Sequence, residues 1–339
     1  MILDLTLFVA GIVLAWLTVS DVFETVVVPG GSRASLQVKR RIGMVLLAMY
    51  KLARGPRRGI SSAFAPLVLV SSFVLWMALL ALAFGLMAFG ARSHFNPPLS
   101  NFGDAIYEAG GALLTIGLSP HYPGGAGRWI ILASGFCGLA VITMAVTYLL
   151  EVQSSIARRD IGIIKLNTSA GDPPSALTLL ERFAAIGNRH ALPKDLQEGR
   201  NWCATVRQSH TTHPSLIYFR STSTGSGWPA TLGALLDLAL IAEHLIDDDA
   251  LYGPAILLRE EGTRMATQLA RIARLTPAES KTDESELEQV AQRLASSGYE
   301  LRANYSLAAM ASQRTEHMSC VDALAEHLGR GTTVLIRQS

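Results

Sequence analysis

Residues 101–120 form a short polar stretch in which part of the backbone is expected to lie outside any helix, with its peptide groups free to bind a ligand. Asp104 suits a helix N-cap, about a dozen helix-compatible residues follow it, and the run Thr115-Ile116-Gly117-Leu118-Ser119 then favours irregular backbone. Irregular backbone is tolerated at membrane depth only where protein covers it or where it lines a water-filled cavity, because an unpaired peptide group in lipid is costly. We therefore expect this stretch to enter a membrane, line a cavity and return.

Two long uncharged runs flank this stretch, and each is long enough to cross a membrane. Residues 64–91 and 129–150 carry no charge over 28 and 22 residues, and both lengths span about 30 Å of hydrocarbon. The composition agrees, since half of the 339 residues are hydrophobic, 17% are charged and the mean hydropathy is +0.31. The sequence therefore predicts a membrane protein with a short re-entrant segment between two spans.

This order of elements, ending in Thr-hydrophobic-Gly before the second span, resembles the pore module of potassium channels over roughly residues 64–151. The resemblance implies an outer helix at 64–91, a pore helix at 102–114, a filter at 115–119 and a pore-lining inner helix at 129–151. It further implies that Thr115, Ile116 and Gly117 use a hydroxyl and successive carbonyls to replace the hydration shell of a cation. The expected permeant ion is K⁺, and no cofactor is expected.

The outer half of the filter departs from the family pattern Thr-Val-Gly-Tyr-Gly. Leu118 stands where Tyr is usual, Ser119 where the second Gly is usual, and Pro120 where Asp is common. If Ser119 takes the positive φ of a filter glycine, the cost is roughly 1–2 kcal/mol, and a following proline favours extended backbone instead. We expect intact inner ion sites and an outer mouth of another shape, which leaves a non-selective cation channel as an alternative.

Three further residues near the filter have two interpretations each. Gly135 and Gly138 fall where the family often carries a gating hinge, and the alternative is close packing against the outer helix. His121 is a candidate pH-sensing residue of the mouth, and the alternative is a solvated loop histidine.

The first 30 residues predict an additional transmembrane helix. Residues 5–20 are uncharged, and the segment is long enough to span when counted from Leu5 through Val28. It lacks the basic start of a signal peptide. Asp21 and Glu24 lie one turn apart near its end. They are either functional intramembrane acids or interfacial acids that pair with basic residues downstream, and we favour the second interpretation.

The segment 31–62 is basic and predicts the orientation of the chain. Residues 33–63 contain no acid, and 42–53 read as a short interfacial helix with its cations toward lipid head groups. With the cations Arg158 and Arg159 after the last span, this places the N-terminus outside and the C-terminus in the cytoplasm. Nucleic-acid binding is not expected beside a membrane span.

The remainder of the chain predicts a linker at 153–174 and a helical cytoplasmic domain at 175–339. Apolar residues recur at helical spacing in 176–186, 232–246, 255–275, 286–294 and 301–328. No Gly-x-Gly-x-x-Gly follows a strand, so a nucleotide-binding regulatory domain is not supported. The predicted fold is therefore an all-α membrane protein with three transmembrane helices, a re-entrant pore helix and an all-α assembly or regulatory domain.

A metal site in this domain is a minor alternative. His210 and His213 lie three residues apart, and Cys203, Glu243 and His244 are conceivable partners. Pro214 indicates that a helix ends at His213, and surface or helix-end histidines are the default. No metal site is assigned, and three scattered cysteines predict no disulfide framework.

Together these observations predict a potassium-channel-like cation channel and no enzyme. One pore segment encloses no conduit, so several copies must surround an axis, and the family precedent is a homotetramer. We assign it to a bacterial inner membrane on its compactness. A receptor or scaffold that kept this architecture without conducting is the alternative, and an intramembrane protease comes third because Asp21 and Asp104 are predicted on opposite sides of the membrane.

Overall fold

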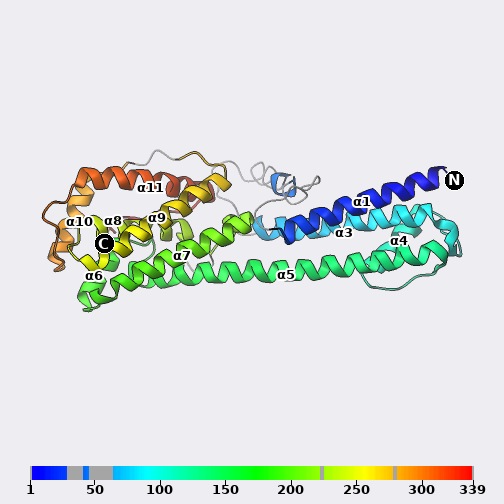
Figure 1. Ribbon diagram of the computed structural model, residues 1–339, viewed down its shortest axis with the longest axis horizontal. Helices are drawn as coiled ribbons and strands as arrows, with labels where there is room; N and C mark the ends of the chain where they lie inside the picture. Colours follow the sequence, from blue (N-terminus) through cyan, green and yellow to red (C-terminus); the bar gives the residue numbers. More distant parts are fainter. Residues whose placement is uncertain (1, 29–40, 46–63, 222–224, 278–280, 338–339) are drawn as a thin grey trace. The chain divides into compact units, whose positions relative to one another are not determined.

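A computed structural model describes residues 2–28, 41–45, 64–221, 225–277 and 281–337, and these divide into two compact units that meet in the chain after Val152. Both units are built from helices (Figure 1). Most of the basic segment 31–62, including residues 46–53 of the predicted interfacial helix 42–53, lies outside the described residues. Residues 41–45 are helical.

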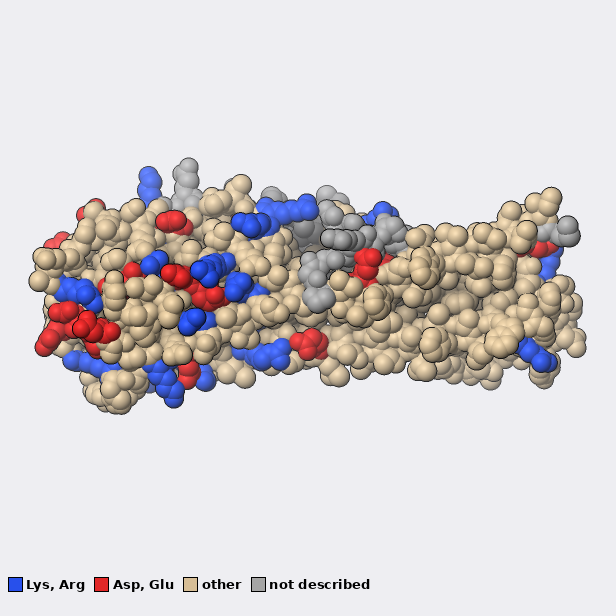
Figure 2. Space-filling view, in the orientation of Figure 1, with Lys and Arg blue, Asp and Glu red and all other residues tan. Residues whose placement is uncertain are grey.

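The first unit contains three helices that are long and apolar enough to cross a membrane. They are α1 (Ile2–Val26), α3 (Phe64–Gly90) and the first part of α5 (Gly125–Ala170). Few charged side chains lie on the face of this unit drawn in Figure 2, whereas they are numerous on the second unit. Because Leu, Val, Ile and Trp side chains cover much of its surface, the unit is suited to a lipid environment.

Glycines bring α1 and α3 into close antiparallel contact. A Cβ at Gly11 would lie 2.5 Å from the backbone oxygen of Ala83, and a Cβ at Gly90 would lie 2.6 Å from that of Asp4. Small residues allow this approach where lipid gives no hydrophobic drive for association. The first helix is therefore an integral part of the unit.

Two polar contacts fasten the same pair of helices. Trp76 Nε1 donates a 2.8 Å hydrogen bond to Asp21 Oδ2, and both residues are buried. An ion pair of 3.2 Å joins Arg92 to Asp4 at the other end. Asp21 is thus a buried acid bonded to an indole of α3. The expected pairing with basic residues downstream involves residues that lie mostly outside the described ranges, so it stays a prediction.

A small antiparallel ladder closes the connection between α3 and α5. After the 3₁₀ turn η1 (Arg92–His94), β1 (Phe95–Asn96) pairs with β2 (Tyr122–Pro123), and Gly124 N donates to the His94 carbonyl at 2.6 Å. Between the strands lies α4 (Phe102–Leu113). The chain therefore leaves and returns at one place, and α4 with the loop after it is held at both ends.

The helix α5 continues to Ala170, well past the point where the sequence analysis ended the inner helix. Most of the segment predicted as a linker at 153–174 is therefore helix. Residues 153–170 contain no proline and a single glycine, Gly162, so no residue there ends the helix. The stop comes at Gly171, whose φ of 85° is left-handed and which two prolines follow.

The second unit is a helical domain. It contains the end of α5 and six α-helices in its described residues, which are α6 (Ala176–Ala185), α7 (Leu192–Thr212), α8 (Gly227–His244), α9 (Asp249–Ile272), α10 (Glu284–Ser296) and α11 (Leu307–Leu328). The 3₁₀ turns η2 (Arg189–Ala191) and η3 (Pro214–Tyr218) flank α7. The core centres on α8, which is buried from Gly227 through Glu243.

One charged pair sits inside this core. Asp237 of α8 is fully buried, and Arg314 of α11 donates two hydrogen bonds to its carboxylate at 2.7 and 3.1 Å. A bidentate pair of this kind satisfies a carboxylate that burial alone would destabilise. It fixes α8 against α11.

The last turns of α5 pack into the same domain. A Cβ at Gly162 would lie 2.1 Å from Trp202 Cδ1 of α7, so the indole occupies the space that a larger residue would fill. Trp202 Nε1 donates a 2.9 Å hydrogen bond to the Arg159 carbonyl, and the buried Arg159 guanidinium donates to the Leu216 carbonyl at 3.3 Å. The end of α5 is thus part of the domain core.

Candidate functional site

The short helix α4 begins with a reciprocal capping box. Asp104 N donates to the Asn101 side chain at 2.9 Å, and Asn101 N donates to Asp104 Oδ2 at 3.3 Å. The N-cap is therefore Asn101, and the prediction that Asp104 is the cap was wrong. An Asn at the N-cap and an acid three residues later each accept from a backbone amide of the other, so together they pair two amides at the helix start. A single Asp at the N-cap lacks this second acceptor.

Backbone contacts hold α4 against both long helices. A Cβ at Gly85 of α3 would lie 2.9 Å from Ile106, and a Cβ at Gly138 of α5 would lie 1.9 Å from the Leu113 carbonyl oxygen. The buried Ser134 hydroxyl of α5 donates to the Ala109 carbonyl at 2.8 Å. These contacts fix the C-terminal end of α4 and therefore the start of the loop after it.

The loop at 114–119 folds back on the end of α4. Ile116 N and Gly117 N both donate to the Gly111 carbonyl, at 2.8 and 3.4 Å. Thr115 has a φ of 58° and Gly117 a φ of 71°, so left-handed backbone stands on both sides of Ile116. The loop is therefore built from irregular backbone that its own helix supports.

Thr115 is the strained residue of this loop. Among the described residues only Thr115 and Arg274 combine a side chain at Cβ with a positive φ. For a β-branched residue that conformation is an outlier, costing about 1–3 kcal/mol, and such strain clusters at functional sites. The observation makes Thr115 the strongest candidate among the residues of the loop.

The outer part of the loop departs from the geometry of the family filter, as the sequence analysis expected. Ser119 is absent from the positive-φ residues, so it does not mimic a filter glycine. Its hydroxyl accepts from His121 N at 2.9 Å and donates to the His121 carbonyl at 2.7 Å, while Leu118 is 67% exposed. Pro120 favours extended backbone at the residue before it, which accounts for the difference.

A buried carboxylate behind the loop holds His121. Glu108 of α4 is 5% exposed, and its Oε1 lies 2.9 Å from His121 Nδ1 in a hydrogen bond. The default interpretation of His121 as a solvated loop residue was therefore wrong, and the sequence analysis passed over Glu108. An acid inside a predicted re-entrant helix is a functional suspect, and that signal was available. The pair ties the chain after the loop to the helix before it.

The protein-family comparison matches this region. The family described as "Ion channel" covers residues 68–154, about a quarter of the chain. This segment is an ion-channel module of the potassium-channel-like type. No curated protein and no solved structure matches the chain.

In this module α3, α4 and α5 stand as outer helix, pore helix and inner helix. They extend over Phe64–Gly90, Phe102–Leu113 and Gly125–Ala170, where the sequence analysis placed them at 64–91, 102–114 and 129–151. Thr115, Ile116, Gly117, Leu118 and Ser119 form the loop that follows the pore helix. The module therefore has the order of elements that the resemblance implied.

The two candidate hinge glycines have unequal surroundings. Gly138 lies against the end of the pore helix, whereas a Cβ at Gly135 would lie 3.4 Å from the Ala112 carbonyl oxygen, an ordinary contact. Close packing is thus a property of Gly138, and its partner is the pore helix, not the outer helix that the sequence analysis named. Whether either glycine bends during opening stays a prediction.

The other chemistry-bearing residues of the sequence analysis are dispersed in the helical domain. Glu243 accepts from Arg259 at 2.6 and 3.1 Å, and His244 hydrogen-bonds Gln313. Cys203 and His210 are buried on α7, which ends at Thr212, one residue before His213. In the described ranges no three His, Cys, Asp or Glu side chains meet as a metal site.

Proposed function

We propose that the chain assembles into an oligomeric pore that conducts monovalent cations, with K⁺ as the permeant ion and Thr115–Gly117 at the ion-binding constriction. The strained Thr115 backbone carries this proposal, since it supports a filter in which backbone oxygens face an ion. Ile116 is 57% exposed in the single chain and Leu118 is 67% exposed, which is consistent with neighbouring copies around an axis. Four copies are proposed from the family precedent.

We further infer that the pore lies in a bacterial inner membrane with the N-terminus outside and the helical domain in the cytoplasm. The cations of the 31–62 segment and those after residue 157 support this orientation, because cytoplasmic flanks carry an excess of Lys and Arg. The lipid bilayer is its proposed environment.

The helical domain gates or assembles this pore through α5. That helix runs without a break from Gly125 into the domain, where Trp202 and the Arg159 contacts fix its end. A rearrangement of the domain core would therefore act directly on the helix that packs against Leu113 at the end of α4. Trp202→Ala on α7 should alter the open probability of the channel. The change Arg200→Gln, at an exposed position of α7, should leave the open probability unchanged.

A non-conducting receptor or scaffold is a second candidate. The Ser119 hydroxyl bonds to His121, and Leu118 and Pro120 replace residues that usually complete the filter, so the outer half is not a standard ion site. A non-selective cation pore is the intermediate case, in which only the inner half binds ions.

Cation flux in liposomes separates these functions. Purified full-length protein is reconstituted, and K⁺ and Na⁺ fluxes are compared under imposed gradients, with Thr115→Ala as the variant that removes the inner hydroxyl. Flux favouring K⁺ and reduced by Thr115→Ala supports the proposal, and equal K⁺ and Na⁺ flux supports the non-selective pore. No flux from wild type and from the Ser119→Gly, Pro120→Asp double variant would refute conduction and favour the receptor.

A further inference from the structure

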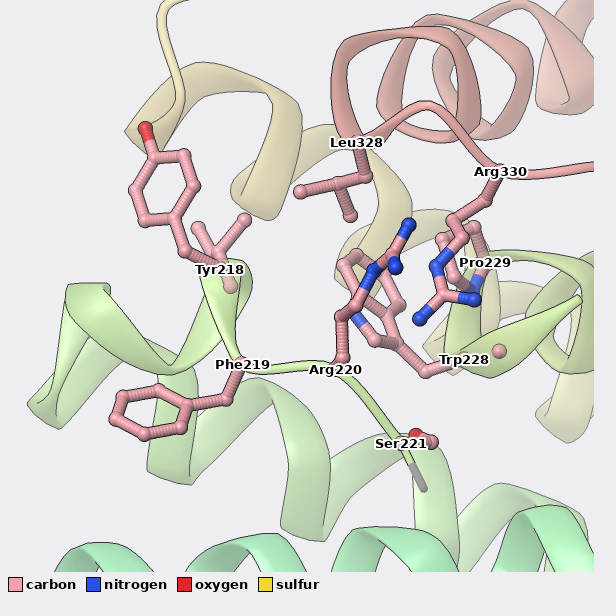
Figure 3. A pocket seen from close by; sticks show the side chains of 10 residues that line it. Tyr218, Phe219, Arg220, Ser221, Trp228, Pro229, Leu328 and Arg330 are labelled. Atoms are coloured by element: carbon pink, nitrogen blue, oxygen red, sulfur yellow. The ribbon is translucent and has the colours of Figure 1, made fainter. Parts of the chain in front are cut away.

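A pocket in the helical domain lies where the chain leaves η3, where α8 begins and where α11 ends. Its cavity volume is about 10 Å³, room for about one water-sized group, and it opens to solvent. Its lining combines two arginines, Arg220 and Arg330, with the aromatic side chains of Tyr218, Phe219 and Trp228. Figure 3 shows the guanidinium groups of Arg220 and Arg330 extending into the same space beside the Trp228 ring.

The two arginines lack carboxylate partners within the described residues. Arg220 is exposed and Arg330 donates to a carbonyl, that of Gly225, at 2.7 Å. Two acids that bond to residues in or beside the pocket are already engaged. Asp160 accepts from Arg159 and Ser221, and Asp172 accepts from the backbone amides of Gly225 and Ser226 and from the Ser226 hydroxyl. The pocket therefore has a local excess of positive charge.

The start of α8 adds a hydrogen-bond donor to the pocket. Ser226 stands at the N-cap, and its hydroxyl donates to Asp172 instead of making a capping bond. Trp228 is 2% exposed, and its Nε1–H has no hydrogen-bond partner in the part of the chain that the structure describes. A buried donor without an acceptor costs about 1–3 kcal/mol, so the arrangement is suited to an acceptor that arrives with a ligand.

We propose that this pocket binds a phosphate group, carried either by a soluble phosphorylated molecule or by a lipid head group. Two guanidinium groups and the Trp228 indole line this space from different elements, and a tetrahedral dianion offers acceptor oxygens in several directions. A planar carboxylate would present fewer acceptor oxygens. The site is separate from the ion pore, so this proposal does not depend on conduction.

The electrostatics of Arg330 agree with an anion that belongs there. Burial first, and then the cations of Arg220 and Arg159, hold the pKa of Arg330 below its usual range, while Asp172 acts in the opposite direction. A bound phosphate would relieve this repulsion and return charge balance to the pocket.

Thermal unfolding of the full-length protein tests the proposal. Protein in detergent micelles is titrated with inorganic phosphate, with sodium chloride at equal ionic strength as the reference, and the apparent Kd is taken from the rise in Tm. The same protein is also compared in nanodiscs of phosphatidylcholine with and without phosphatidic acid. The variants are Arg220→Gln, Arg330→Gln and Trp228→Phe, and the matched control is Arg200→Gln, an exposed arginine of α7.

Phosphate should raise the Tm of wild type and of Arg200→Gln, and Arg220→Gln should weaken phosphate binding by about 10- to 100-fold, as expected for lost charge-assisted hydrogen bonds. Stabilisation by phosphatidic acid alone, again lost in Arg220→Gln, would identify a lipid head group as the source. Because the Arg220 side chain makes no hydrogen bond or ion pair with the residues that the structure describes, this variant should fold even if Arg330→Gln does not. If neither probe stabilises wild type beyond chloride, or if both pocket variants respond as wild type does, the proposal is wrong.

Discussion

Replacing Gly138 by alanine should disturb the pore loop, because the inner helix has no room for a methyl group there. A Cβ at this position would lie 1.9 Å from the Leu113 carbonyl oxygen, and an ordinary contact begins at 3.4 Å. The end of α4 and α5 would have to separate by about 1.5 Å. Overpacking of this kind costs about 1–3 kcal/mol, although alanine itself favours the helix by about 1 kcal/mol.

The displaced atoms belong to the last residue of α4, directly before the strained loop, so the cost should appear in conduction as well as in stability. An energy of 1–3 kcal/mol shifts a two-state equilibrium by about 5- to 150-fold. We expect Gly138→Ala to reduce K⁺ flux in liposomes within that range and to lower the Tm in detergent.

Gly135→Ala is the matched control. It lies almost one turn away on the same helix, and its Cβ would make an ordinary 3.4 Å contact. It should retain flux and keep or slightly raise the Tm. If the two alanine variants behave alike, whether both are normal or both are impaired, the packing argument fails, and equal impairment would favour a hinge that needs both glycines.

Three further perturbations test contacts described above. Trp76→Phe removes the donor to buried Asp21 and should lower the free energy of unfolding by about 1–3 kcal/mol, measured by thermal unfolding in detergent; an unchanged Tm would contradict a structural role for this bond. Glu108→Gln replaces the charged member of the contact with His121 and should reduce ion flux while leaving oligomer size unchanged on size-exclusion chromatography; normal flux would show that the loop does not need this tie. Burial, together with the nearby Arg159 and against a hydrogen bond to the Val206 carbonyl, lowers the pKa of His210 to about 3. Below about pH 6.5 the unfolded chain therefore binds a proton at His210 that the folded chain does not bind. The free energy of unfolding of wild type should fall by about 2 kcal/mol between pH 7 and pH 5, and this fall should be absent in His210→Phe. Parallel pH profiles of the Tm for the two proteins would refute this prediction.

The apolar elements could be predicted from the sequence because length and composition determine them directly. Uninterrupted runs at 64–91 and 129–150 are long enough to span, and the polar segment between them cannot cross a bilayer alone. The same reasoning ended α5 too early, because it treated the first charge, Glu151, as the end of a helix. Charge ends the hydrocarbon span, whereas glycine and proline at 171–174 end the helix.

Contacts between distant residues could not be predicted in this way. Asp21 and Trp76 are 55 residues apart, and Glu108 and His121 meet only because β1 and β2 bring the chain back. Likewise, the spacing of apolar residues did not predict α7. Most residues of this helix are polar, and only a narrow apolar stripe packs on α8 and α9. The φ of Thr115 was also not predictable, since its own preference opposes it and only the surrounding packing imposes it.

The close pairing of α1 with α3 has a consequence for how the protein is made. The contacts of Gly11 and Gly90, the bond from Trp76 to Asp21 and the ion pair of Arg92 with Asp4 all lie within the first 92 residues. A helical hairpin can therefore close during synthesis, before the pore loop and α5 have left the ribosome. The polar segment at 101–120 then enters the bilayer beside a pair of helices that is already in place.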